Sequence, residues 1–393
     1  SSSMICDVKN CVIQDNANYF IDASFASKAN FNVTNNIIDH NVQAINLNFN
    51  GPSDLLVSGN TFNNNTSISS APIIITSGPS QLTANISDNI ISENVCGGLR
   101  VTLNDTNSAQ LTVNKNVLTN NGTGSQGSLG SSIFINPNGT SLGNFNLNLT
   151  DNEFLGNAGF ALYCSNGNFN DIQVNATGNS INNNGAGGFV FATPANTLKL
   201  DALNNIISAG GDNAITTAGI NINVVNMNIS NNQITGNSGS ASGIALSHSG
   251  TDLNLVVTDN NISNNEGSGI IMYPSTEIEN VNIKIENNII NNNQNLGSNA
   301  SGGIDLEQYT NLSGSIANNI LSNNAGSGVY ISSTGLSPAV CLEMTGNNSD
   351  TGYTLENNTG TFNLAPCNVT TVNTGVITTV GTITEVQSCP EAV

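Results

Sequence analysis

A six-residue pattern returns along almost the whole chain and constrains its fold more than any other feature. The pattern is Asn-x-[Ile/Leu/Phe/Val]-x-x-Asn, and successive copies begin 24 to 36 residues apart. Degenerate copies begin at Asn10 and Asn347. Thirteen copies at a nearly constant period are typical of a solenoid, in which each repeat packs only against its neighbours. The eleven regular copies begin at Asn36, Asn60, Asn89, Asn116, Asn152, Asn179, Asn205, Asn232, Asn260, Asn288 and Asn319.

Each repeat also carries three short apolar segments that alternate with a period of two. One precedes the pattern, as at 111–113 and 283–285. A second is the apolar pair inside the pattern, and a third follows a Gly/Asn/Ser stretch, as at 98–101 and 303–306. This alternation favours β-strands, whereas Gly, Asn and Ser in mid-repeat disfavour helix. Leucine-rich repeats have a similar length, but the regular Leu positions that they need are missing. We therefore predict an all-β chain with one triangular coil of three strands per repeat.

Over residues 4–360 this pattern resembles the right-handed parallel β-helix family, in its Asn-rich β-solenoid form. The resemblance implies a single-stranded helix of about 12–13 coils over residues 1–352, with each strand paired to its equivalent one coil on, ~4.8 Å away. Buried Asn amides at the corners would then bond to those above and below, and Asn tolerates a left-handed corner. Extra Asn residues in runs such as 291–295 are interpreted as turn formers. The expected ladder residues are Asn36, Asn60, Asn89, Asn116, Asn152, Asn179, Asn232, Asn260, Asn288 and Asn319.

The two ends of the chain differ in pattern. Residues 4–8 already have the alternation of a coil strand, so we expect an uncapped first coil. The repeat stops near Tyr353, and Thr then alternates with Val and Ile. We expect residues 353–393 to form a separate capping or assembly segment of antiparallel hairpins on the last coil. The stretch 372–386 is similar to the endings of β-helical surface proteins of Gram-negative bacteria, including autotransporter passengers.

Charge and hydropathy exclude several functions. The 393 residues carry a net charge of −20 and only six basic side chains. Neutralising phosphates needs Lys and Arg, so no nucleic-acid partner is expected, and an anionic membrane surface is disfavoured. No apolar run approaches 18 residues, so we expect no transmembrane segment in this chain. The chain opens in mid-pattern, and we expect that upstream sequence was processed away or left out.

Seven cysteines are present, and most lie near the two ends. Cys6 and Cys11 are close enough in sequence to bridge, and two of Cys341, Cys367 and Cys389 could pin the C-terminal segment. Cys96 and Cys164 lie two coils apart, which is too far for a disulfide, so we expect buried small apolar side chains there. Cysteine at the ends favours an oxidising compartment.

Catalytic chemistry has little support in the sequence. Parallel β-helices include polysaccharide lyases, whose sites need a base beside acidic calcium ligands. Arg100 and Asp305 fall on the same strand position but about seven coils apart, or ~34 Å. The Asp-Asp and Gly-His-Gly motifs of polygalacturonase-like hydrolases are absent. We therefore expect no catalytic residues and no cofactor, although the chain is not excluded as an enzyme.

An acidic cluster is the one candidate metal site. Its members are Glu277, Glu279, Asp305 and Glu307, with Glu286 nearby. Carboxylates from neighbouring coils could bind Ca²⁺ or act as a glycosidase pair, but a solvated acidic patch is the favoured interpretation.

A candidate interface follows the strand after the Gly-rich stretch. Its outward position should be polar, yet in several coils it is apolar, between polar members such as Asn221 and Asp305. An apolar outer column indicates that something covers it: the chain's own loops, the C-terminal segment or another subunit. The apolar members are Ile74, Phe134, Val190, Ile271 and Tyr330.

These observations favour an extracellular structural or adhesive β-solenoid, secreted or on the cell surface of a bacterium. It could be a surface-fibre subunit that assembles head to tail, or an adhesin passenger. Its expected partners are other copies of itself, a surface glycan or a host surface. The alternative is a carbohydrate-binding or polysaccharide-degrading β-helix.

Overall fold

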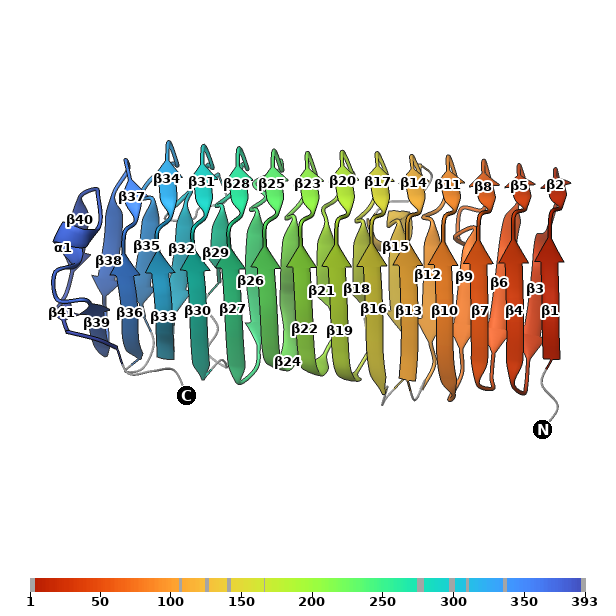
Figure 1. Ribbon diagram of the computed structural model, residues 1–393, viewed down its shortest axis with the longest axis horizontal. Helices are drawn as coiled ribbons and strands as arrows, with labels where there is room; N and C mark the ends of the chain where they lie inside the picture. Colours follow the sequence, from red (N-terminus) through yellow and green to blue (C-terminus); the bar gives the residue numbers. More distant parts are fainter. Residues whose placement is uncertain are drawn as a thin grey trace. The chain divides into compact units, whose positions relative to one another are not determined.

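The computed structural model describes residues 4–105, 108–123, 127–139, 143–165, 167–273, 279–296, 301–308, 311–334 and 338–389 (Figure 1). It divides into two compact units, Ser1–Lys199 and Leu200–Val393. Each unit is a parallel β-solenoid with three strands per turn, which form three sheets. The predicted all-β parallel β-helix is therefore confirmed, with seven complete three-stranded turns described in the first unit and six in the second.

In the first unit, the strands fall into three stacks. Sheet A contains β1 (Met4–Lys9), β4 (Ala29–Thr34), β7 (Ser53–Ser58), β10 (Gln81–Ser87), β13 (Ser108–Asn114), β16 (Asn144–Thr150) and β19 (Phe169–Thr177). Sheet B contains β2 (Val12–Gln14), β5 (Ile37–Asp39), β8 (Thr61–Asn63), β11 (Ile90–Ser92), β14 (Val117–Thr119), β17 (Glu153–Leu155) and β20 (Ser180–Asn182). Sheet C contains β3 (Tyr19–Phe25), β6 (Gln43–Phe49), β9 (Ile73–Ser77), β12 (Leu99–Leu103), β15 (Ile133–Pro137), β18 (Leu162–Ser165) and β21 (Phe189–Ala192). A 3₁₀ turn, η1 (Gly127–Gly130), precedes β15, and β22 (Ala195–Leu203) crosses the boundary between the units.

The second unit repeats the arrangement. The long strand β24 (Ile215–Ser230) contributes to both sheets C and A. Sheet A continues with β27 (Asp252–Thr258), β30 (Asn280–Glu286), β33 (Asn311–Ala317), β36 (Ala339–Thr345), β39 (Thr361–Ala365) and β41 (Thr384–Glu385). Sheet B contains β23 (Ile206–Ser208), β25 (Gln233–Thr235), β28 (Asn261–Ser263), β31 (Ile289–Asn291), β34 (Ile320–Ser322) and β37 (Asn348–Ser349). Sheet C continues with β26 (Ile244–Ser249), β29 (Ile270–Met272), β32 (Ile304–Gln308), β35 (Val329–Ser333), β38 (Tyr353–Asn357) and β40 (Ile377–Val380), and α1 (Val369–Val372) is a single helical turn.

The core of each unit is built from columns of apolar side chains. In β10, Leu82, Ala84 and Ile86 point inward and are at most 2% exposed, while the residues between them face solvent. Parallel pairing stacks Ala84 on Leu55 of the preceding turn and on Leu111 of the next. Burying each large apolar side chain stabilises the fold by about 1.5–3 kcal/mol, so register is fixed wherever the inward face is apolar.

Two asparagine ladders run beside sheet B, and both Asn positions of the sequence pattern take part. At the first position, the backbone N–H and the Nδ2 of each Asn donate to the Oδ1 of the next, as Asn60 does to Asn89 at 2.9 and 3.0 Å. The first ladder comprises Asn36, Asn60, Asn89, Asn116, Asn152 and Asn179 in one unit, and Asn205, Asn232, Asn260, Asn288, Asn319, Asn347 and Asn373 in the other. The second comprises Asn41, Asn65, Asn94, Asn121, Asn157 and Asn184, and then Asn237, Asn265, Asn293 and Asn324.

One expected role of the ladder residues is wrong. The left-handed backbone at each corner belongs to the residue before the ladder Asn, such as Asn287 at φ 57° and Asn292 at φ 52°, rather than to the ladder Asn itself. The ladder Asn amide is occupied by hydrogen bonds to neighbouring turns, while the residue before it bends the chain at the corner. Paired Asn residues in the sequence therefore have separate structural roles, and those before the ladder are turn formers as expected.

The C-terminal segment differs from the expected antiparallel hairpins. β40 pairs with β38 and β41 pairs with β39, and both pairings are parallel. The first ladder also extends past Tyr353, because Asn347 donates to the Oδ1 of Asn373 at 3.0 and 2.9 Å. The solenoid pairing therefore continues beyond the last repeat that the sequence pattern recognises, with α1 inserted into the final coil.

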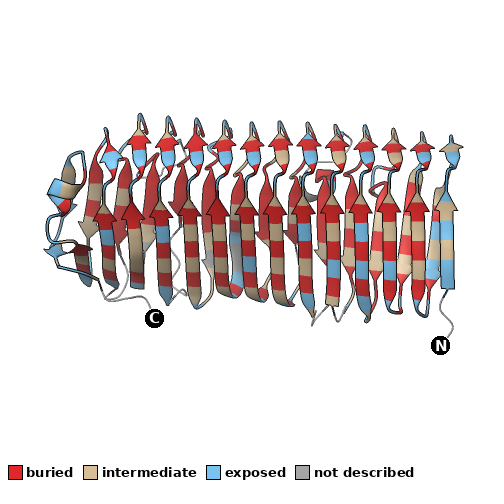
Figure 2. Cartoon of the chain, in the orientation of Figure 1, coloured by how far each residue is buried: buried red, intermediate tan, exposed pale blue. Residues whose placement is uncertain are grey.

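The first described turn is more exposed than the turn next to it (Figure 2). In β1 every residue is exposed or half-buried, and Ile5 is 68% exposed. Val12 at the start of β2 is 66% exposed. The expectation of an uncapped first coil stays a prediction.

Candidate functional site

A shallow polar hollow on the outer face of sheet A is the best candidate site in the first unit. Its volume is about 330 Å³. Every lining side chain is a carboxamide or a hydroxyl, and none carries a charge. The lining residues are Thr83, Gln110, Thr112, Asn146, Asn148, Gln173 and Asn175.

The strand register explains why these residues meet. Thr83, Gln110, Asn146 and Gln173 occupy one outward position on four consecutive turns, in β10, β13, β16 and β19. They form what we call the outer column. Equivalent atoms on adjacent turns lie ~4.8 Å apart, so the outer column presents a polar group at each step along the stack.

A second row of the hollow lies two residues further along each strand. It comprises Thr112, Asn148 and Asn175. Asn175 Nδ2 donates to Asn148 Oδ1 at 2.8 Å, so these two amides are partly satisfied by each other. In contrast, within the described part of the chain, the side chains of Gln110, Asn146 and Gln173 make no hydrogen bond to protein. Their donors and acceptors are therefore available to a ligand or to water.

Sequence reasoning missed this hollow. The available signal was the outward residues of the strand before each Asn pattern, in "QLTANIS", "SAQLTVN", "NFNLNLT" and "FNDIQVNAT". In four successive repeats those positions hold only Gln, Asn, Thr, Ser or Asp. An unbroken polar run of that length on one column is the pattern that would have indicated a binding face.

The candidate interface on sheet C does not form a continuous exposed apolar surface. Phe134, Val190 and Ile271 are buried, and Ile74 and Tyr330 are half-buried. Contact between these residues and a partner stays a prediction.

The membership of that column also differs from expectation. Tyr163, which the sequence reasoning omitted, pairs with both Phe134 and Val190. In the second unit Thr216 holds the place given to Asn221, which pairs with Ser249. The misassignment arose because the Gly-Ile-Asn-Ile stretch at 219–222 imitates the start of this strand, whereas the paired strand already begins at Ile215.

Part of the cover over this column in the first unit comes from the chain itself. Phe160 stacks on Tyr163 with ring centroids 5.3 Å apart, and Tyr163 lies 5.8 Å from Phe134. The Arg100 guanidinium lies 5.6 Å from the Phe134 ring centroid, which is within cation–π range. The cavity beside Arg100, lined partly by Cys96 and Leu129, measures about 10 Å³. It is too small for a ligand, so this cluster is packed rather than open.

The predicted acidic cluster is spread over two sheets. Asp305 and Glu307 lie on β32 in sheet C, whereas Glu279 directly precedes β30 of sheet A, and Glu277 lies outside the described residues. Asp305 is fully buried, and its Oδ2 accepts the backbone N–H of Ser301 at 3.1 Å. Within the described ranges, no three His, Cys, Asp or Glu side chains are grouped so that they could hold a metal ion.

Two tyrosines near this cluster have perturbed pKa values. Burial, with a smaller contribution from the Asp305 charge, raises the pKa of Tyr273. Tyr330 donates its hydroxyl proton to Glu356 Oε2 at 2.8 Å. Burial is the main cause that raises the pKa of Tyr330 to about 12, and the bond to Glu356 adds to it. Both hydroxyls therefore stay protonated near neutral pH.

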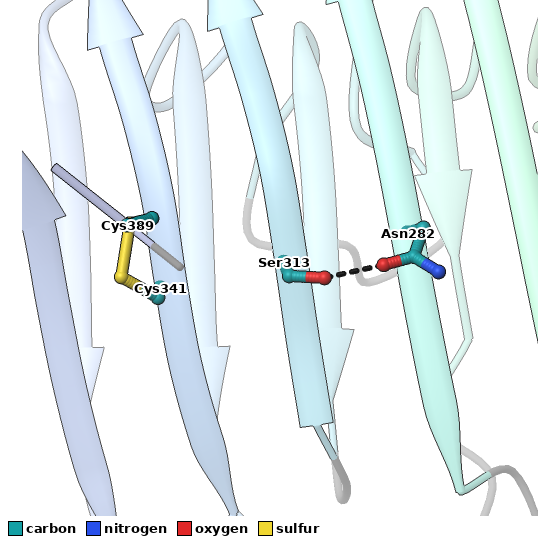
Figure 3. Close-up of a disulfide and its surroundings, with 4 residues drawn as sticks. All are labelled: Asn282, Ser313, Cys341 and Cys389. Atoms are coloured by element: carbon teal, nitrogen blue, oxygen red, sulfur yellow. Dashed lines mark hydrogen bonds between the residues drawn. A yellow bond between two sulfur atoms is a disulfide. The ribbon is translucent and has the colours of Figure 1, made fainter. Parts of the chain in front are cut away.

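One C-terminal disulfide is present, as expected for that group of cysteines. Cys341 of β36 is bonded to Cys389, which lies against the outer face of sheet A (Figure 3). The neighbouring turns of the same outward column carry Ser313 and Asn282, which are hydrogen-bonded to each other. Cys367 is outside the disulfide, and its Sγ accepts a hydrogen bond from Gln387 Nε2 at 3.0 Å.

The expected bridge between Cys6 and Cys11 is wrong, because neither residue forms a disulfide. Cys6 lies in the middle of β1, and the strand continues to Lys9 before the corner. Roughly 10 Å of extended chain therefore separates Cys6 from the corner, which is too far for a disulfide to Cys11. Cys11 holds the first-ladder position of its turn, where its backbone N–H donates to Asn36 Oδ1 at 2.9 Å. Cys96 and Cys164 are buried, as expected for small apolar side chains.

No helix among the described residues is long and apolar enough to cross a bilayer. The solenoid architecture and its asparagine ladders support the resemblance to parallel β-helices at the level of the fold. Comparisons of the chain with models of protein families, with curated proteins and with solved structures found no match.

Proposed function

We propose that this chain is an extracellular adhesive β-solenoid of a bacterial surface, which binds a glycan or host surface through the outer face of sheet A. The observation that carries the proposal is the hollow in the first unit, where uncharged amides and hydroxyls from four consecutive turns face outward. A shallow, repeated polar surface suits binding to another extended, repeated surface better than it suits a small ligand, which needs a deep and mostly apolar pocket.

The rigid frame behind the hollow supports the same proposal. The ladder Asn residues that follow the ends of these strands are held by several hydrogen bonds each, and the inward side chains of β10, β13, β16 and β19 behind the hollow are buried. Preorganised groups lose less conformational entropy when they bind, so a weak polar contact on such a frame contributes more affinity.

The disulfide between Cys341 and Cys389 supports an extracellular location, because disulfides persist in oxidising compartments. The likeness of residues 372–386 to Gram-negative surface proteins supports a place on a bacterial surface, as an adhesin passenger or as a fibre subunit. The extracellular location and the place on a bacterial surface are both proposals, which fractionation of the source cells can test.

Adhesion by coated beads tests the function directly. Fluorescent beads that carry the purified chain are washed over immobilised mucin, bacterial cells, cultured epithelial cells and purified polysaccharides, beside beads that carry serum albumin. We expect retention on at least one surface well above the albumin beads. If the chain-coated beads are retained on none of them, the adhesive proposal is overturned.

A structural-fibre role is favoured by a separate observation, the exposed first turn. Ile5 and Val12 are apolar, more than half exposed and adjacent to strand edges that are paired on one side only among the described residues. Such an edge can pair with another chain. This second candidate predicts end-to-end association in solution.

A further inference from the structure

We propose that the hollow binds an uncharged polysaccharide laid along the stack of turns, with Gln110, Asn146 and Gln173 as its principal hydrogen-bonding residues. This inference rests on the proposed adhesive function and names the ligand class of that function. The occupant that we infer is a neutral, hydroxyl-rich glycan chain, which crosses β10, β13, β16 and β19 at right angles to the strands.

The chemistry of the lining favours hydroxyl groups as partners. A carboxamide offers two N–H donors and a carbonyl acceptor, and a sugar hydroxyl both donates and accepts. The amides of the outer column are not committed to protein partners, whereas Asn148 and Asn175 on the neighbouring row bond to each other. A sugar can therefore use the outer column without breaking an existing protein hydrogen bond.

The spacing of the column favours a polymer over a single sugar. Adjacent turns repeat every ~4.8 Å. That distance is close to the length that one sugar residue adds to an extended glycan chain. Successive sugars can then meet Gln110, Asn146 and Gln173 in turn, although each contact by itself is weak. Repetition along one chain converts weak contacts into useful avidity.

Charge separates neutral from acidic glycans. None of the seven lining residues is charged, and the chain as a whole has a net charge of −20. A polyuronate would therefore gain no counter-charge in the hollow and would be repelled by the protein as a whole. A protein partner is disfavoured for another reason, because the hollow lacks the aromatic or Arg anchors that dominate protein interfaces.

Affinity electrophoresis tests the inference. The full chain is run through native gels that contain dextran, galactomannan, β-glucan or polygalacturonate, and retardation gives an apparent dissociation constant for each polymer. Three further chains are compared: Gln110→Ala with Gln173→Ala, Gln173→Ala alone, and Asn254→Ala with Asn282→Ala. The last pair removes two outward amides from sheet A of the second unit and is the matched control.

We expect at least one neutral polymer to retard the natural chain and the control pair equally. The Gln110/Gln173 double substitution should weaken that retardation by about tenfold or more, and Gln173→Ala alone by less. These side chains face outward on sheet A, so circular dichroism and thermal melting should be unchanged. Polygalacturonate should not retard any of the chains.

Three results would overturn the inference: no retardation by any neutral polymer, retardation that the double substitution leaves intact, or retardation by polygalacturonate alone. The bead experiment separates this failure from failure of the proposed function. If beads carrying the double-substituted chain adhere as well as the natural chain, the protein is adhesive but the hollow is not its glycan site. If no beads adhere and no polymer retards the chain, both proposals fail.

Discussion

At the residue scale, the side chain of Asn116 serves groups on several turns. Its Oδ1 accepts the backbone N–H and the Nδ2 of Asn89 at 3.0 and 2.9 Å. Its Nδ2 donates to the carbonyl of Ile86 at 2.8 Å and to Asn152 Oδ1 at 3.0 Å. A single carboxamide therefore satisfies buried groups that have no access to water, which explains why one residue type recurs at this position.

Replacing Asn116 by Ala should destabilise the first unit by about 2–4 kcal/mol, because several buried donors and acceptors lose their partner at once. Urea unfolding measures the global effect, and hydrogen exchange should show faster opening at β11, β14 and β17. Asn148→Ala is the matched control, since that amide faces outward and should cost less than about 0.5 kcal/mol. Equal destabilisation by both substitutions would contradict the ladder as the source of stability.

The left-handed corner residues offer a gain in stability. Ala209 has φ 52°, at a corner position where most other turns have Asn or Gly. A residue with a Cβ atom pays roughly 1–2 kcal/mol to adopt the left-handed conformation. Gly avoids this strain, but it loses more conformational entropy on folding, which offsets part of the gain. Ala209→Gly should therefore stabilise the second unit by about 0.5–1 kcal/mol in urea unfolding. Asn231→Gly is the control and should change stability by less, because Asn already tolerates the left-handed corner. A loss of stability in Ala209→Gly would contradict backbone strain at Ala209.

The hydroxyl of Tyr330 should make stability depend on alkaline pH. Its pKa is raised from an ordinary value near 10 to about 12, mainly by burial. The neutral hydroxyl is the form that the fold favours, so its contribution is complete below pH 10 and is lost as pH rises towards 12. Thermal melting across this range should fall more steeply for the natural chain than for Tyr330→Phe, which has no proton to lose. Identical slopes would contradict this assignment.

Residue-level patterns also mark how far the sequence could predict the fold. The spacing of Asn36, Asn60 and Asn89 predicted the repeated coil, the apolar alternation predicted its three strands, and the family resemblance implied the buried ladder. It could not show which Asn of a pair would adopt the left-handed corner, because φ depends on how the closed turn is joined, and either Asn is chemically suited to it. Asn373 was missed for a different reason: α1 lies between β39 and Asn373, so the alternating strand no longer leads directly into the ladder position as it does in other turns.

At the element scale, alternation along each strand predicts which side chains face outward but not what they form together. Gln110 and Gln173 are outward by parity alone. The hollow depends on side chains from four turns and on the bond between Asn148 and Asn175, and neither can be read from one strand. The prediction for the C-terminal segment was wrong for a different reason. The Thr/Val alternation of 376–386 predicted strands, but it could not predict their parallel pairing, because alternation has the same period in parallel and antiparallel sheets.

The disulfide should hold the C-terminal segment in place. Cys341 and Cys389 are 48 residues apart in sequence, and the bond ties the tail to β36. Reduction or Cys389→Ser should release up to about 4 kcal/mol of loop-closure stabilisation. Hydrogen exchange should then accelerate in β40 and β41 while β27 and β30 stay protected. Cys367→Ser, which leaves the disulfide intact, is the control and should exchange like the natural chain. Unchanged protection of β40 after reduction would contradict a structural role for the bond.

At the scale of the whole molecule, a solenoid differs from a globular protein in how stability is distributed. Each turn contacts only its neighbours, so stability is close to a sum of local terms, and an end turn lacks half of its contacts. That asymmetry is visible at β1, where the inward Cys6 stacks on Phe31 of the next turn and has no described turn on its other side. The outer edge of β1 therefore presents backbone N–H and C=O groups that can pair with another strand.

End-to-end association should follow from that edge if the chain is a fibre subunit. Ile5 and Val12 expose apolar surface beside the unpaired edges of β1 and β2. We expect particles in negative-stain images to lengthen as protein concentration rises, and sedimentation to show a matching increase in mass. Ile5→Lys with Val12→Lys should abolish the growth, because a charged edge resists strand pairing. Lys at the outward Asn85, away from the edge, is the control and should leave it intact. Single particles of the natural chain at every concentration would contradict the fibre role and would leave adhesion through sheet A as the remaining proposal.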